Sequence, residues 1–162
     1  MPRNPKYPLE HLREHRHRNV DAATARLGDA VRAREVADEA KRRADEQRDE
    51  AASRASAVRS EEAARLMTGD LRVADLARAN AWEHAASAEI ADLRRAVGRA
   101  EGLLTSAHGA EGEAKAALAH QKADLDVVAK DEARFDARVR AAGEAAEEEA
   151  ADEAFAARRR EG

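Results

Sequence analysis

The sequence contains no cysteine and very few aromatic residues. Without cysteine, disulfides and thiolate metal sites are excluded. The aromatic residues are one tryptophan, one tyrosine and two phenylalanines, and most of the 43% hydrophobic fraction is alanine. Because alanine buries little surface, a compact core of large apolar side chains is not expected.

Proline is absent after the first few residues, and glycine is sparse. All three prolines (Pro2, Pro5 and Pro8) precede Leu9. A charged fraction of 38% can indicate disorder, but disordered chains are usually rich in proline, serine and glycine. Dominance by alanine, glutamate, arginine, aspartate and leucine is typical of long helices and coiled coils. We therefore expect an all-α fold.

Long hydrophobic runs are also missing. No apolar stretch approaches the roughly 20 residues that a membrane-spanning helix needs. No apolar run follows the N-terminal charges, so we expect no secretory signal peptide and a soluble, cytoplasmic protein. The formal net charge of -4 is nearly balanced for this length, which disfavours a general nucleic-acid binder.

Proline and glycine positions predict how the chain is organised. Pro8 suits the first turn of a helix, where its missing N–H is no loss. Gly69 can take the left-handed conformation that ends a helix, and Thr68 or Asp70 can cap the next one. The predicted segments are an extended lead-in (1–8), a first helix (9–67), a turn (68–71) and a second helix (72–160).

A seven-residue repeat runs through the predicted second helix. The alternating 3-4 series from Leu76 to Ala146 is apolar or alanine at all but four positions, Glu83, Glu111, Gln121 and Glu132. Such a repeat predicts the seam of a left-handed coiled coil. Because the repeat keeps its phase across four glycines, we expect one continuous helix through this region; they are Gly98, Gly102, Gly109 and Gly112.

The predicted first helix has a thinner apolar seam, interrupted by arginines. A short turn makes its pairing with the second helix antiparallel. The sequence therefore predicts a long antiparallel two-helix coiled-coil hairpin whose second helix is the longer. The expected seam positions are Leu9, Leu12, Val20, Ala23, Leu27, Ala30, Ala37, Ala40, Ala44, Ala51, Val58 and Leu66.

The unequal lengths of the two helices predict an unpaired stretch at the end of the second. With the turn centred on Gly69, Leu9 lies opposite about Lys130, which leaves Phe135, Val139 and Phe155 without a partner from the first helix. Large apolar groups on an unpaired helix usually mark a docking site for another protein. The alternatives are that this stretch frays or that the chain dimerises through it.

Charged and histidine-containing segments lie near both ends. His11 and His15 share a helix face, but neighbouring arginines would repel a cation, so we expect no metal site and no cofactor. Near the other end, the acidic run 147–149 precedes three arginines, 158–160, which suit the last turn of a helix. No catalytic triad spacing or phosphate-binding loop is present, so the sequence predicts a protein that is not an enzyme.

Two short patterns resemble those of a known family. The stretch Lys6-Tyr7-Pro8-Leu9-Glu10-x-Leu12-Arg13-Glu14 opens a charged, alanine-rich helix, and Met67-Thr68-Gly69-Asp70-Leu71 leads into Leu76 and Trp82. With the two-helix architecture, these patterns resemble the FliJ/YscO stalk proteins of type III secretion, flagellar or injectisome. The resemblance covers nearly the whole chain. One departure is the run Arg-Glu-His-Arg-His-Arg after Leu12, where the family has a second group of apolar residues.

The resemblance implies a non-catalytic stalk that is cytoplasmic and peripheral to a membrane-embedded secretion apparatus. Such a stalk binds the ring of the export ATPase and links it to the export gate protein and secretion chaperones. Carried onto this sequence, the ATPase-facing residues are Leu9, Leu12, Arg13, Arg16 and Val20, with Phe135 and Val139 opposite or just beyond. Phe155 completes the predicted partner-binding residues because it lies on the unpaired end of the second helix.

Two other interpretations of the sequence remain open. The first is a structural coiled-coil protein that forms a homo-dimer and acts as a spacer or scaffold. The second is a helix that folds only on membranes. Light scattering with the purified export ATPase distinguishes the first from the stalk, and circular dichroism with lipid vesicles tests the second.

Overall fold

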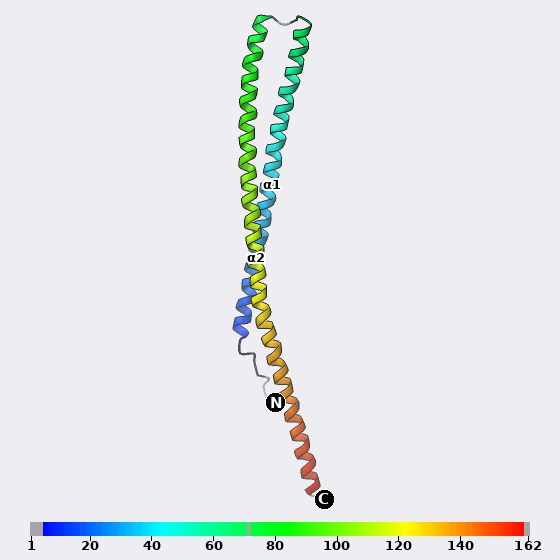
Figure 1. Cartoon of the computed structure of the whole chain (residues 1–162). Coiled ribbons are helices and arrows are strands. Elements are labelled where there is room, and N and C mark those ends of the chain that lie inside the picture. The colour runs from blue at the N-terminus through cyan, green and yellow to red at the C-terminus, as the bar shows by residue number, and fades with distance from the viewer. Residues whose placement is uncertain (1–4, 71, 161–162) are drawn as a thin grey trace. The chain divides into compact units, whose positions relative to one another are not determined.

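The computed structural model describes residues 5–70 and 72–160, which are helical except for the lead-in and the turn. Helix α1 (Glu10–Met67) and the longer helix α2 (Val73–Arg160) pack against each other in opposite directions (Figure 1). The predicted all-α two-helix fold is therefore confirmed. Both helices begin one residue later than predicted. Residues 1–4 of the lead-in and residue 71 of the turn lie outside the described residues.

The end of α1 is fixed by a glycine at the predicted position. Gly69 has a φ of 75°, the left-handed conformation in which a Cβ would be strained. The N–H of Asp70 donates to the carbonyl of Arg65 at 3.1 Å, and that of Gly69 donates to Leu66 at 3.2 Å. These two bonds form the Schellman motif that satisfies the last carbonyls of a helix.

The start of α2 is capped differently from the prediction. The backbone N–H of Arg72 donates to a carboxylate oxygen of Asp75 at 3.1 Å, so the acidic residue three positions later serves as the acceptor. Thr68 instead donates its hydroxyl to Asp70 at 2.8 Å. The expectation that Thr68 or Asp70 would cap α2 was wrong, because these two side chains bond each other within the turn.

Contacts between the helices group into two compact units. Of the described residues, we call 28–70 and 72–113 the turn unit, and 5–27 with 114–160 the terminal unit. Each contains a piece of α1 and a piece of α2. The buried residues of the turn unit include Ala51, Ala55, Ala86 and Ala100, whereas those of the terminal unit are Tyr7, Ala23 and Val128.

The seven-residue repeat of α2 is confirmed by burial. From Ala79 to Val139, every position of the predicted 3-4 series is buried or half-buried except Glu83. The helix is continuous through the glycine-containing stretch, as predicted. Its four glycines are exposed, and a Cβ added to any of them would meet nothing within 4 Å. These glycines therefore lower the stability of the helix, and the packing does not require the absence of a side chain at any of them.

Eight of the twelve predicted seam positions of α1 are buried or half-buried, and the other four are exposed. Leu9 and Leu12 are 42% and 37% exposed, and Ala40 and Leu66 are exposed as well. The side chains that face α2 follow a strict 3-4 series of six alanines, five long basic residues, three larger apolar residues and one glutamate. The basic residues fit in this series because their stems are apolar and their charged ends find acidic partners. This series consists of Arg13, Arg16, Val20, Ala23, Leu27, Ala30, Arg34, Ala37, Lys41, Ala44, Arg48, Ala51, Ala55, Val58 and Glu62.

Ion pairs show the register of the helices within each unit. In the predicted register, which sets Leu9 opposite Lys130, the numbers of two paired residues sum to about 139. Arg34 of the turn unit would then lie beside residue 105, but its Nε lies 2.9 Å from Glu111. In the terminal unit Arg16 was expected beside residue 123 and pairs with Asp124 at 2.8 Å. Both partners lie further along α2 than predicted, because long arginine side chains reach along the partner helix and the turn is centred beyond Gly69.

Candidate protein-binding site

The structure divides the eight predicted binding residues by exposure. Leu9, Leu12 and Phe155 are exposed, with Phe155 65% accessible. The other five are half-buried in the contact between the helices of the terminal unit; they are Arg13, Arg16, Val20, Phe135 and Val139. All eight belong to the terminal unit, but only the three exposed ones present large apolar surface to a partner.

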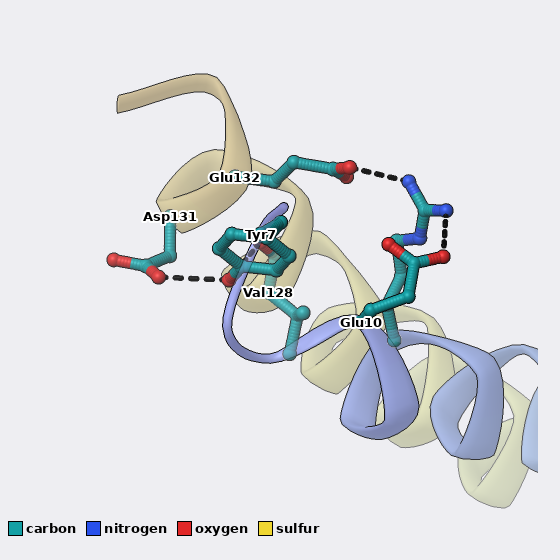
Figure 2. Close-up of polar contacts among 6 residues, drawn as sticks. Tyr7, Glu10, Val128, Asp131 and Glu132 are labelled. Carbon is teal, nitrogen blue, oxygen red and sulfur yellow. Dashed lines mark hydrogen bonds and ion pairs between the residues drawn. The ribbon is translucent and has the colours of Figure 1, made fainter. Parts of the chain in front are cut away.

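Tyr7 fastens the lead-in to α2 (Figure 2). Its side chain is 8% exposed, and its hydroxyl donates a 2.7 Å hydrogen bond to Asp131. The ring packs against Phe135, with the two centroids 5.6 Å apart and the planes tilted by 59°. Burial, followed by the hydrogen bond to Asp131, raises the pKa of Tyr7 to about 12. This residue was not among the predicted binding residues, although it was part of the motif that carried the family resemblance.

The lead-in shortens the unpaired stretch of α2. Phe135 was expected to have no partner from the first helix; it contacts Tyr7 of the lead-in, and Pro5 and Val139 line one groove of about 480 Å³. The unpaired stretch is shorter than expected because the register lies further along α2, with Arg13 paired to Glu132, and because the lead-in packs beside it. Residues 140–159 are all exposed, and we call them the C-terminal segment.

Arg13 lies between two carboxylates beside Tyr7. Its guanidinium donates to Glu132 on α2 and, at 2.5 Å, to Glu10 on its own helix (Figure 2). The hydrogen bond to Glu132 is the main cause that raises the pKa of Arg13. Because the charge of Arg13 is satisfied within the chain, this residue positions the helices and offers little to a partner.

Arg16 forms the next polar contact of the terminal unit. One terminal nitrogen pairs with Asp124 at 2.8 Å, and His120 lies 3.6 Å from the same carboxylate. The Nε of Arg16 and the side-chain oxygen of Gln121 are buried without a hydrogen-bond partner in the described part of the chain. Two arginines of the basic run after Leu12, Arg13 and Arg16, thus form ion pairs with carboxylates of α2, which partly explains this run.

A second exposed apolar cluster lies beside the turn, where no binding residue was predicted. Its four side chains are Leu66, Met67, Val73 and Leu76, and Met67 and Val73 are 91% and 85% exposed. Met67 and Val73 fall outside both heptad series, which is the sequence signal that could have identified them. We call these four residues the turn cluster.

A metal site and a membrane-spanning helix each place requirements on the described residues. Within 5–70 and 72–160, no group of three or more histidine, aspartate or glutamate side chains is arranged to hold a metal ion. None of the described helix residues forms a stretch that is long and apolar enough to cross a membrane.

Comparisons with known proteins identify no family for this chain. No family model matches the sequence, and neither a curated protein nor a solved structure matches it.

Proposed function

We propose that this chain is a non-catalytic stalk protein of a type III secretion export apparatus. It binds the export ATPase ring and links the ring to the export gate protein and to secretion chaperones. The observation that carries the proposal is the presence of exposed large apolar side chains in each unit. A linking protein needs two contact surfaces, and exposed apolar groups are the usual centres of such surfaces.

The ATPase contact is assigned to the terminal unit. Leu9, Leu12 and Phe155 are exposed there, and Tyr7 and Arg13 hold the lead-in and the start of α1 against α2. A surface that is ordered before binding loses less conformational entropy when a partner docks. The turn cluster then serves the gate or a chaperone.

Stimulation of ATP hydrolysis tests the first contact. The purified chain is titrated into its export ATPase, and we expect hydrolysis to rise with a saturable dependence on the chain. Replacing Leu9, Leu12 and Phe155 with alanine should weaken the apparent affinity by about tenfold or more, since each buried leucine or phenylalanine contributes about 1.5–3 kcal/mol. Val127→Ala, in the same unit and 68% exposed, is the matched control and should change nothing.

Variants of the turn cluster distinguish the two proposed contacts. Met67→Ser with Val73→Ser should leave ATPase stimulation unchanged and reduce binding to the gate protein or chaperone in a pull-down. A chain that forms a stable dimer and leaves ATP hydrolysis unchanged at every ratio would contradict the stalk, and would favour a structural spacer or scaffold instead.

A further inference from the structure

Charges in the C-terminal segment are separated into blocks. After Arg140, which opens the segment, the acidic residues come first and the remaining basic residues follow Phe155. The acidic block is Glu144, Glu147, Glu148, Glu149, Asp152 and Glu153, and the basic residues after Phe155 that are described with side chains are Arg158 and Arg159. All of these side chains are exposed.

Several charges of the two blocks have no ion-pair partner among the described side chains. Glu144, Glu148 and Asp152 follow one another at four-residue spacing, an arrangement that destabilises a helix. The positions three and four residues before each arginine are alanine or Phe155, so no carboxylate is within reach there. Among the side chains that the structure describes, none forms an ion pair with Glu147, Glu148 or Arg158. The helix dipole favours arginine in a last turn but does not account for the acidic block.

Both blocks reach the helix face that carries Phe155. The guanidinium carbon of Arg159 lies 6.0 Å from the centroid of the Phe155 ring, so these two side chains share a face. Glu148 precedes Phe155 by seven residues, which is two helical turns, and lies on the same face. Arg158 and Glu147 flank this face on one side. An acidic end, a central aromatic ring and a basic end therefore lie along one stripe.

We propose that the C-terminal segment binds the same segment of a second copy as an antiparallel helix pair, with the two-fold axis beside residue 153. In this register Phe155 lies opposite Ala151 of the second copy. Glu148 lies opposite Arg158, and Glu147 lies opposite Arg159. The antiparallel direction sets each acidic end against a basic end, whereas a parallel pair would set like charges together.

The size of this surface defines the kind of dimer that it supports. Residues 147–159 span about 20 Å of helix, which makes a contact smaller than the roughly 800 Å² per partner of a standard stable interface. Its ion pairs are exposed and screened by salt. The dimer is therefore weak, reversible and favoured by low ionic strength. The dimer uses Phe155, which the proposed ATPase contact also uses, so dimerisation is measured on the chain alone and stimulation of ATP hydrolysis is measured in a separate experiment.

Charge reversal tests the register. Sedimentation equilibrium of the full chain at rising concentration and low salt should show reversible dimerisation that weakens by tenfold or more in high salt. Arg158→Glu with Arg159→Glu should weaken the dimer by tenfold or more, and so should Glu147→Arg with Glu148→Arg. Mixing these two variants should produce a heterodimer, and combining all four changes in one chain should restore the homodimer. Circular dichroism checks that each variant keeps its helicity.

A matched control separates the proposed face from net charge. Glu149→Arg with Glu153→Arg changes the net charge as much as Glu147→Arg with Glu148→Arg does, but both positions lie away from Phe155 on the helix. This control should dimerise like the unchanged chain. The proposal is overturned if the unchanged chain stays monomeric at every concentration. It is also overturned if the control weakens the dimer as much as the paired reversal, or if mixing the reversed variants forms no heterodimer.

Discussion

In the turn unit the buried apolar residues are all alanines, whereas the terminal unit buries Tyr7 and Val128 beside Ala23; half-buried arginines pair with α2 in both units. Ala55 of the turn unit is 1% exposed, which makes it the most buried of the named core residues. In the terminal unit Tyr7 and Val128 are buried, and the ring of Tyr7 packs against Phe135. Alanine lets two backbones approach closely but removes little apolar surface from water. An aromatic ring keeps the backbones further apart but removes much more apolar surface from water.

Substitutions that change side-chain size should destabilise the two kinds of contact in opposite ways. At an almost fully buried alanine such as Ala55, extra atoms must displace neighbouring side chains, so enlarging this residue should destabilise the chain more than a conservative truncation would. A contact built from a few larger side chains has most of its apolar area in those residues, so truncating one should cost the most. Substitutions of opposite direction in the two units test this difference.

Enlarging Ala55 should have the largest effect. Ala55→Leu adds three carbon atoms at a position where α1 lies against α2, and we expect it to destabilise the chain by about 3 kcal/mol, the upper end for overpacking. Urea unfolding followed by circular dichroism measures the change. Ala57→Leu, two residues away and exposed, is the matched control and should change stability by less than about 0.5 kcal/mol. Equal losses in the two variants would show that the seam is not closely packed at Ala55.

Truncating Val128 should have the next largest effect. Val128 is 6% exposed and its carbonyl lies 3.4 Å from the Tyr7 hydroxyl, so Val128→Ala removes two methyl groups under the lead-in. We expect a loss of about 2 kcal/mol, from about 0.8 kcal/mol per buried carbon and a small cavity. Its neighbour Val127 is 68% exposed, and Val127→Ala should leave the unfolding midpoint unchanged. A loss no larger than that of the Val127→Ala control would mean that the lead-in does not cover Val128.

The repeat of α2 could be predicted because its inward positions are apolar. Seventeen apolar or alanine positions in a constant phase define the seam, and burial follows that phase from Ala79 to Val139 with one exception. The end of α1 could be predicted because a glycine with positive φ leaves a strong local signal. Both features depend on residue types whose local preference agrees with the fold.

The seam of α1 could be predicted only in part from apolar residues because five of its fifteen inward positions are basic. Arg13, Arg34 and Arg48 are half-buried, and Arg13 and Arg34 pair with glutamates of α2 far along the sequence. Their role depends on those partners, which a helix-by-helix pattern does not contain. The contact of Tyr7 with Phe135 was missed for a similar reason, since it depends on the path of an extended lead-in. Whether the exposed residues bind a partner stays a prediction.

The smallest expected effect is a change in the pKa of Tyr7, and its titration tests whether this side chain is buried in the terminal unit. Burial is the first cause that raises its pKa to about 12 from an ordinary 10.0, and the hydrogen bond to Asp131 is the second. A tyrosine that holds its proton more tightly in the folded chain contributes stability in full below pH 10.0, and this contribution is lost as the pH rises toward about 12. Because Tyr7 is the single tyrosine of the chain, ultraviolet absorbance of tyrosinate reports its ionisation without interference from another tyrosine.

The absorbance midpoint should lie near pH 12 in the unchanged chain. Asp131→Asn should lower it only part of the way toward 10.0, since the negative charge is removed while the burial remains. Asp126→Asn, which changes a carboxylate paired with Lys130 rather than with Tyr7, is the control and should leave the midpoint in place. A midpoint near 10.0 in the unchanged chain would place the Tyr7 hydroxyl in water, and the terminal unit would then lose the aromatic contact that distinguishes it from the turn unit.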